Sequence, residues 1–169
     1  MGLVVEPLGK QHDRANFDSG QAEIDDWFRH RAGQDERRNL ARVFVAVDDR
    51  LGVVGFHSLN SFTLALADLP DDIARKLPHY DAIPAALIGR LARDLRVRGQ
   101  GIGGLLLADA VRRVLGAGRT LAVFAIVVDA KDARAAAFYR DFGFRPFPLH
   151  PDRHFLLAST AVAAMERPP

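Results

Sequence analysis

The chain has no cysteine among its 169 residues, which excludes disulfide bonds, thiolate metal sites and cysteine nucleophiles. It also has no internal repeat, no low-complexity stretch and no apolar run of membrane-spanning length. Its first ten residues lack the pattern of a signal peptide. From these absences we expect a cytoplasmic protein with no membrane partner.

The composition is otherwise that of an ordinary folded domain. Hydrophobic residues make up 49% of the chain and charged residues 26%, and the length predicts a single domain over residues 1–169. The formal net charge is only +2, but 20 of the 23 basic residues are arginine. Residues 85–169 hold thirteen bases and seven acids, whereas residues 1–84 hold ten and fourteen. Because arginine suits bidentate phosphate contacts, this distribution is compatible with CoA or RNA as a ligand.

The most informative segment is the glycine-rich run Arg98-Gly99-Gln100-Gly101-Ile102-Gly103-Gly104. It follows a strand-like apolar segment at residues 86–92 and precedes a helix-like one at residues 105–111. A strand, a glycine-rich turn and a helix in this order direct unpaired backbone N–H groups and the positive end of a helix dipole at one point. The segment therefore predicts a bound phosphate or pyrophosphate.

Two common phosphate motifs do not fit this run. A Walker A loop needs Lys-Ser or Lys-Thr after its last glycine, where this chain has Leu105. Gly99, Gly101 and Gly104 match the spacing of a dinucleotide-binding fingerprint, but Asp109 comes too early to bind the ribose. That fingerprint usually opens its fold, whereas here nearly a hundred residues precede it.

The remaining pattern, Arg98-x-x-Gly101-x-Gly103, resembles the acetyl-CoA pyrophosphate loop of the GNAT superfamily of N-acetyltransferases. A second segment, residues 132–144, resembles a helix signature of the same superfamily and follows an apolar run at residues 121–128. The two motifs stand in the order and context of the family, which makes them more specific together than either is alone.

The resemblance implies an α/β fold with a central mixed sheet of six to seven strands, flanked by helices. It also implies that two parallel strands, residues 88–95 and 121–128, splay apart so that the pantetheine arm inserts between them. The acetyl-CoA-binding core would then cover about residues 86–145.

The cofactor contacts also follow from the resemblance. Backbone groups of Leu91, Ala92 and Arg93 would hold the pantetheine and the acetyl group, and the run 98–104 would hold the pyrophosphate. Asp132 occupies a position where many relatives carry an asparagine that binds the pantetheine. An ionised aspartate cannot donate a hydrogen bond, and capping of the following helix is an alternative role for it. No metal ion is required.

Tyr139 stands at the family's general-acid position. The thiol of CoA has a pKa near 8.5 and a phenol one near 10, so we expect Tyr139 to protonate the departing sulfur, or hydrogen-bond to it, without a strong pKa shift. The alternative is a tyrosine that only packs in its helix. Phe138, one position earlier, is expected to face the core because adjacent helical positions point about 100° apart.

No general base is evident in the sequence. The scattered histidines His57, His79, His150 and His154 are interpreted as surface or structural residues. An α-amine with a pKa near 8 is substantially neutral at pH 7–8, whereas a lysine amine with a pKa near 10.4 would need a base. The missing base therefore favours an α-amino acceptor.

Most of the chain resembles one GNAT subgroup, the toxins of type II toxin–antitoxin modules that acetylate aminoacyl-tRNA. Segments 17–20, 26–28, 53–59, 87–94 and 131–139 carry this resemblance. It implies an enzyme that blocks translation, forms a homodimer and is neutralised by a small ribbon-helix-helix antitoxin. The candidates for its tRNA-binding surface are Arg29, Arg31, Arg37, Arg38 and Arg90.

Two other functions stay open at this point. One is a GNAT enzyme that acetylates a small-molecule amine or a protein N-terminus, and the other is a non-catalytic acyl-CoA-binding module. Periodicity further predicts strands at residues 3–8, 42–47, 52–66, 144–148 and 154–158, helices at 23–28, 70–77, 100–116 and 131–142, and a frayed tail from residue 161.

Overall fold

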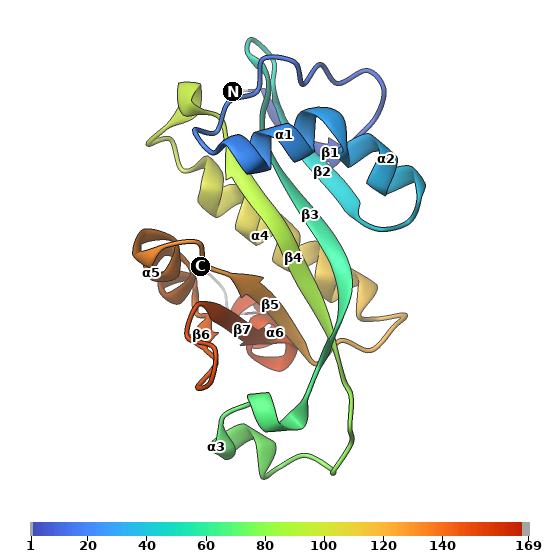
Figure 1. The fold of residues 1–169 in the computed structure, drawn as a ribbon, viewed down its shortest axis with the longest axis vertical. Coiled ribbons are helices and arrows are strands. Elements are labelled where there is room, and N and C mark those ends of the chain that lie inside the picture. Colours follow the sequence, from blue (N-terminus) through green and yellow to red (C-terminus); the bar gives the residue numbers. More distant parts are fainter. Residues whose placement is uncertain (1, 167–169) are drawn as a thin grey trace. The chain divides into compact units, whose positions relative to one another are not determined.

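The computed structural model describes residues 2–166, which form both strands and helices (Figure 1). In chain order they are β1 (Leu3–Pro7), α1 (Ala22–His30), α2 (Ala32–Arg37), β2 (Arg42–Asp48), β3 (Gly52–Leu64), η1 (Leu66–Asp68), α3 (Asp71–Ala74), β4 (Ile83–Arg93), η2 (Leu95–Val97), α4 (Ile102–Ala117), β5 (Ala125–Asp129), α5 (Ala133–Phe142), β6 (Arg145–Pro146), β7 (Arg153–Leu157) and α6 (Ala158–Glu166).

The strands form a seven-stranded sheet in the order β1-β2-β3-β4-β5-β7-β6. β1 with β2, β2 with β3, β5 with β7 and β6 with β7 are antiparallel, whereas β4 and β5 are parallel. The parallel register pairs residues 85–88 with residues 125–128. The predicted mixed sheet flanked by helices is thereby confirmed, and the splaying of its parallel strands stays a prediction.

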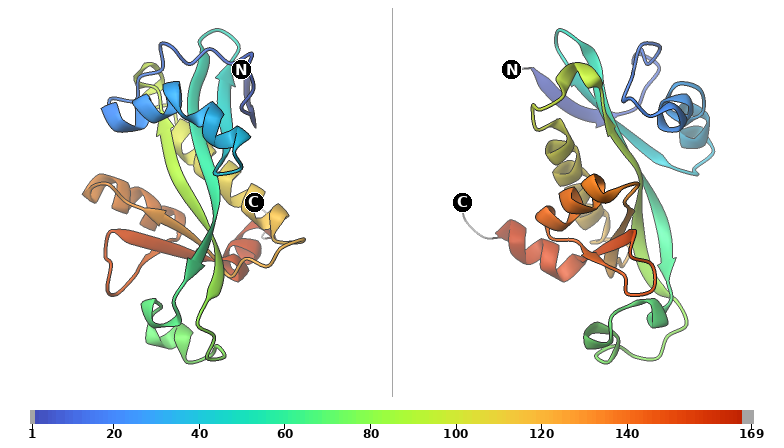
Figure 2. Two further views of the ribbon diagram at one scale, coloured as in Figure 1. Left: turned by 45° about the vertical axis from the view of Figure 1, so that its right-hand side comes forward. Right: turned by 60° about the vertical axis from the view of Figure 1, so that its left-hand side comes forward.

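The chain divides into two compact units, and the first comprises residues 1–60 and 89–112. On one face of its strands, Trp27 and Phe28 of α1 pack in a cluster with Phe56 of β3. On the other face, Leu106 of α4 packs with Val54 of β3. Figure 2 shows α1 and α2 on the opposite side of these strands from α4. This unit carries the glycine-rich loop.

The second unit comprises residues 61–88 and 113–169 and carries Tyr139. One buried cluster joins Leu69 and Ile73, beside and within α3, to Val127 of β5 and Phe155 of β7. Successive residues of a strand point to opposite faces. Phe155 therefore belongs to this cluster, whereas the preceding residue, His154, faces Tyr139 of α5.

The structure corrects three expectations about the elements. β5 begins at Ala125 rather than Leu121: its ladder with β4 pairs Ala125 with Ala85, and one further backbone hydrogen bond between the two segments, from the N–H of Phe124 to the carbonyl of Pro84, precedes it. The tail was expected to fray from Ala161, but an alanine-rich stretch continues as α6 to Glu166. Residues 167–169 lie outside the described part of the chain. The short α2 lies in a basic segment for which periodicity did not predict a separate helix. No helix within residues 2–166 has the length and hydrophobicity to span a membrane.

Candidate acetyl-CoA and acceptor site

The segment that leads from β4 into the glycine-rich loop is fixed by Asp94. Its carboxylate accepts hydrogen bonds from the backbone N–H groups of Asp18 (3.1 Å) and Arg96 (2.9 Å) and pairs with the Arg96 guanidinium. Burial alone would raise the pKa of Asp94, but the hydrogen bonds from Arg96 and Asp18 outweigh it and hold the pKa below its ordinary value. The loop therefore starts from a rigid point.

The loop itself has a backbone that only glycine adopts without strain. Gly99 and Gly101 have φ angles of +79° and +77°, in the left-handed region. Gly101 precedes α4, and the N–H groups of residues 101–104 have no hydrogen-bond acceptor within the described part of the chain. A Cβ on Gly104 would project into open space. The residues present thus fit a pyrophosphate, with free N–H donors and the positive end of a 16-residue helix.

A hydrogen bond between a buried histidine and a half-buried aspartate connects α4 to the sheet behind the loop. His57 of β3 is fully buried, and its Nε2 lies 2.8 Å from Oδ2 of Asp109 on α4. A charged hydrogen bond of this kind contributes roughly 1.5–3 kcal/mol. The interpretation of His57 as a structural residue is consistent with this contact, which sets the position of the helix that would hold the cofactor.

Tyr139 is held in a closely packed environment in the second unit. Asp132 caps α5 by accepting a hydrogen bond from the N–H of Ala135 at 2.8 Å, which is the alternative role expected for it. The Tyr139 ring is only 7% exposed and packs against Phe144 and His154. Phe138 was expected to face the core, but it is only half-buried. Of these two adjacent residues, Tyr139 is the one that faces the core.

Burial, together with the nearby Asp129 carboxylate, raises the pKa of Tyr139 to about 12. The expectation that the phenol needs no strong shift is therefore corrected. A phenol of this pKa stays protonated at neutral pH and is a hydrogen-bond donor. Full proton transfer to a thiolate, whose conjugate thiol has a pKa near 8.5, is uphill by about 5 kcal/mol.

The raised pKa makes protein stability depend on pH in the alkaline range. The unfolded phenol ionises near pH 10 and the folded one near 12, so the contribution is fully present below pH 10 and is lost as pH rises to 12. We expect the free energy of unfolding to fall by about 2–3 kcal/mol across this window. Chemical denaturation of Tyr139→Phe should lack this component, whereas Tyr80→Phe, which removes the other tyrosine, should retain it.

The three strand residues expected near the pantetheine lie in β4. Ala92 is 5% exposed in the cluster under α1, and Leu91 packs against the opposite cluster under α4. Arg93 is half-buried. The side chains of these residues pack on the two faces of the strand. Their backbone groups are therefore the ones available to contact a ligand.

The arginines expected to bind tRNA differ in their surroundings. The Arg90 guanidinium lies 4.0 Å from the centre of the Trp27 ring, whose Nε1 donates to Asp35. Arg29 donates to the carbonyl of Phe17 and thereby joins two segments of the unit. The remaining predicted residues, Arg31, Arg37 and Arg38, are exposed.

Arg14 joins this group, although the sequence did not single it out. The guanidinium groups of Arg14 and Arg37 flank Gly33 in α2, and burial followed by the charge of Arg37 lowers the pKa of Arg14. Burial and the charge of Arg31 likewise lower the pKa of Arg90, against the opposing effect of Asp35. We define Arg14, Arg31, Arg37, Arg38 and Arg90 as the arginine cluster; within residues 2–166 none of them forms an ion pair with a carboxylate.

These features are matched by known proteins. A model of the "Acetyltransferase (GNAT) domain" family matches residues 39–146, and the chain belongs to the GNAT acetyltransferase family, whose members are N-acetyltransferases. The chain is similar to a "Probable toxin TacT" of Sinorhizobium fredii, at 36% identity over 96% of this chain and 94% of that protein. It is also similar to a "tRNA-acetylating toxin" of Mycobacterium tuberculosis, at 38% identity over 89% of each chain.

Solved structures agree with this assignment. AtaT complexed with acetyl-methionyl-tRNAfMet superposes with a TM-score of 0.89 at 25% identity, covering 97% of this chain and 99% of that one. AtaTR bound with acetyl-CoA superposes with a TM-score of 0.83 at 25% identity, covering 96% and 98%. The predicted family and its sheet are therefore confirmed.

Proposed function

We propose that this chain transfers the acetyl group of acetyl-CoA to the α-amine of an aminoacyl-tRNA and is the toxin of a toxin–antitoxin pair. The observation that carries the proposal is the similarity over nearly the whole chain to relatives named as tRNA-acetylating and as a toxin. The glycine-rich loop and Tyr139 supply the donor half of such a site, and the arginine cluster supplies a surface for the polyanionic acceptor.

In the proposed reaction, the free N–H groups of residues 101–104 and the Arg98 side chain bind the pyrophosphate, and the backbone of residues 91–93 orients the acetyl group. The acceptor amine forms a C–N bond with the acetyl carbon while the C–S bond breaks. The phenol of Tyr139 donates a hydrogen bond to the leaving sulfur and takes up the amine proton as it gives its own. Because this exchange leaves the phenol neutral, its raised pKa is compatible with the role.

Asp132 stays a candidate contact for the pantetheine in this proposal, although its carboxylate also caps α5. The whole chain would act as one domain and as a homodimer in the cytoplasm, neutralised by a small ribbon-helix-helix antitoxin. The support for these last features is the resemblance to the toxin subgroup. The expected physiological result of the activity is a block of translation.

A direct assay tests the proposal. The protein is incubated with acetyl-CoA and a mixture of charged tRNAs, and the N-acetyl-aminoacyl products are identified by mass spectrometry after digestion. We expect at least one acetylated aminoacyl species and arrested growth on expression. Tight binding of acetyl-CoA without any acetylated aminoacyl product would refute it, and harmless high expression would argue against the toxin role.

The arginine cluster provides a separate prediction about tRNA affinity. Replacing Arg31, Arg37 and Arg38 together by alanine is expected to weaken tRNA binding and to reduce the slope of log affinity against log salt by about 0.7–0.9 per lost phosphate contact. Filter binding over a salt series measures this slope, with acetyl-CoA binding unchanged. The matched control replaces three exposed arginines elsewhere, Arg50, Arg75 and Arg119, and an equal effect there would contradict the assignment.

A further inference from the structure

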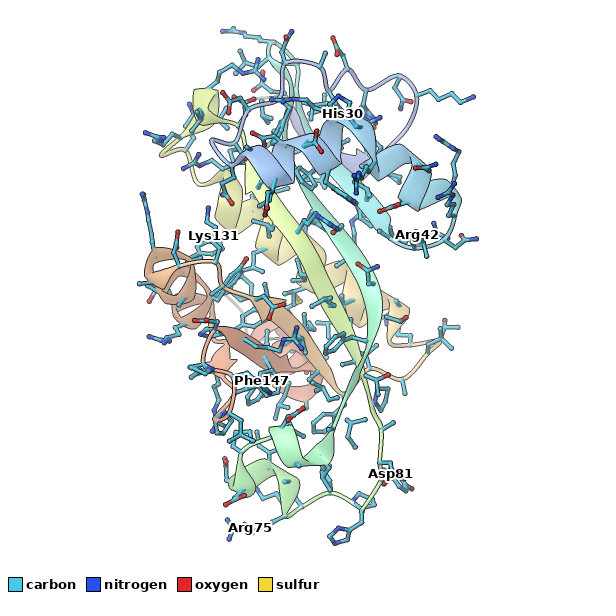
Figure 3. All side chains as sticks on the ribbon, viewed as in Figure 1. His30, Arg42, Arg75, Asp81, Lys131 and Phe147 are labelled. Atoms are coloured by element: carbon cyan, nitrogen blue, oxygen red, sulfur yellow. The ribbon has the colours of Figure 1, made fainter. Side chains whose placement is uncertain are left out.

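The second unit contains a pocket that neither the glycine-rich loop nor Tyr139 lines. Its volume is about 530 Å³, within the range of about 300–1,000 Å³ typical of small-ligand sites. Apolar walls come from the end of β3, with Phe62 and Leu64, and from the connection between β6 and β7, with Phe147 and Leu149. Figure 3 shows Phe147 among the side chains between α3 and the C-terminal strands.

We infer that this pocket receives the side chain of the acceptor amino acid and selects uncharged or basic side chains over acidic ones. The inference deepens the proposed function and rests on it. Three carboxylates, those of Asp68, Asp129 and Asp152, outnumber the two basic side chains that line the pocket, those of Arg153 and His150. The fixed charge facing an occupant is therefore negative.

The Arg153 guanidinium already interacts with Asp129 and with the ring of Phe62. Arg153 makes two parallel hydrogen bonds to Asp129, at 2.7 and 3.0 Å, and its guanidinium lies 4.9 Å from the centre of the Phe62 ring. Side-chain hydrogen bonding to Asp129 raises the pKa of Arg153. In this planar pair the charge of the Asp129 carboxylate offsets that of the guanidinium. Arg153 is therefore a poor partner for a carboxylate on the ligand.

In the described part of the chain, the other two carboxylates form no direct contact with a basic group, although the charge of Asp68 also acts on Arg153 from a distance. Within residues 2–166, the side chains of Asp68 and Asp152 form no ion pair and accept no hydrogen bond. A ligand carboxylate placed beside them would be repelled, whereas an amide would meet acceptors and an ammonium would meet opposite charge. The apolar walls would at the same time bury the stem of the side chain.

Strand geometry relates the pocket to the reacting groups. Arg153 and His154 are neighbours on β7 and point to opposite faces, with Arg153 lining the pocket and His154 facing the Tyr139 ring. Asp129, the last residue of β5, lines the pocket and also influences the phenol electrostatically. Within the second unit, the pocket therefore lies at the same strand end as Tyr139 and on the opposite face of the sheet from it.

The test uses one tRNA body charged by an aminoacylating ribozyme with glutamine, glutamate, lysine or glycine, so that only the amino acid varies. Glutamine and glutamate have nearly the same shape, and their ratio of kcat/KM isolates the charge. We expect the wild-type protein to prefer the glutaminyl over the glutamyl substrate by at least about tenfold. In Asp68→Asn/Asp152→Asn the ratio should fall toward one, and use of the lysyl substrate should drop.

The matched control is Asp81→Asn, which removes an equally negative, exposed carboxylate from the connection between α3 and β4 (Figure 3) and should leave the ratio unchanged. Equal use of the glutaminyl and glutamyl substrates by the wild type, or a ratio that the double variant does not change, would overturn the inference. Use of the glycyl substrate alone would overturn it as well, since glycine has no side chain to select. Absence of acetylation with every substrate would instead count against the proposed function.

Discussion

Tyr139→Phe is expected to lower kcat for aminoacyl-tRNA acetylation by about 10²–10³-fold, because the phenol supplies the only hydrogen bond that we assign to the leaving sulfur. The substitution keeps the aromatic ring, which packs against Phe144 and His154, so the fold should be unchanged. Acetyl-CoA affinity should also be preserved, since the loss acts on the transition state rather than on ground-state binding.

Single-turnover acetylation at saturating acetyl-CoA measures this effect directly. Tyr80→Phe is the matched control, because Tyr80 is the other tyrosine of the chain and is 63% exposed. In cells, expression of Tyr139→Phe should be tolerated while that of Tyr80→Phe arrests growth. A Tyr139→Phe protein of full activity would show that the tyrosine only packs in its helix.

Gly104→Val is expected to weaken acetyl-CoA binding by about 2–3 kcal/mol, or roughly 30- to 150-fold. Its side chain would project into open space at the first turn of α4, next to the loop where the pyrophosphate is proposed to bind. Because nothing lies within 4 Å of a Cβ at this position, the apo protein should fold normally. The substitution should therefore lower the affinity for acetyl-CoA without lowering the stability of the protein.

Gly116→Val is the control for this experiment. Gly116 lies near the other end of α4, and a Cβ there also meets nothing within 4 Å. Calorimetric titration with acetyl-CoA should give a wild-type affinity for Gly116→Val and a greatly reduced one for Gly104→Val, with similar melting temperatures. Equal affinities for the two variants would place the pyrophosphate elsewhere.

The sequence predicted the parts of the fold that local chemistry determines. Glycines that require positive φ marked the loop, and the apolar runs on either side of it marked β4 and α4. The capping role of Asp132 could be foreseen because an aspartate that opens a helix satisfies its free N–H groups. The family resemblance then supplied Tyr139 as the candidate general acid, which no spacing rule alone would have singled out.

The sequence could not predict what depends on long-range packing. Phe62, Asp129 and Arg153 come from three separate strands, and only the folded sheet brings them to one pocket. The pKa of Tyr139 was underestimated for the same reason, because burial and the charge of Asp129 act through space. One signal was available in hindsight: Asp129 directly ends a buried apolar run, which is where ligand-binding residues of parallel strands tend to gather.

The division of the chain has a consequence for the gene. Each compact unit is assembled from two separate segments, residues 1–60 with 89–112 and residues 61–88 with 113–169. Each unit has a segment of the other inserted between its own two segments, so a stop codon before residue 113 removes part of both units. Loss-of-function alleles should therefore be spread along the whole reading frame. If expression arrests growth as proposed, the mutants that escape should carry truncations at many different positions.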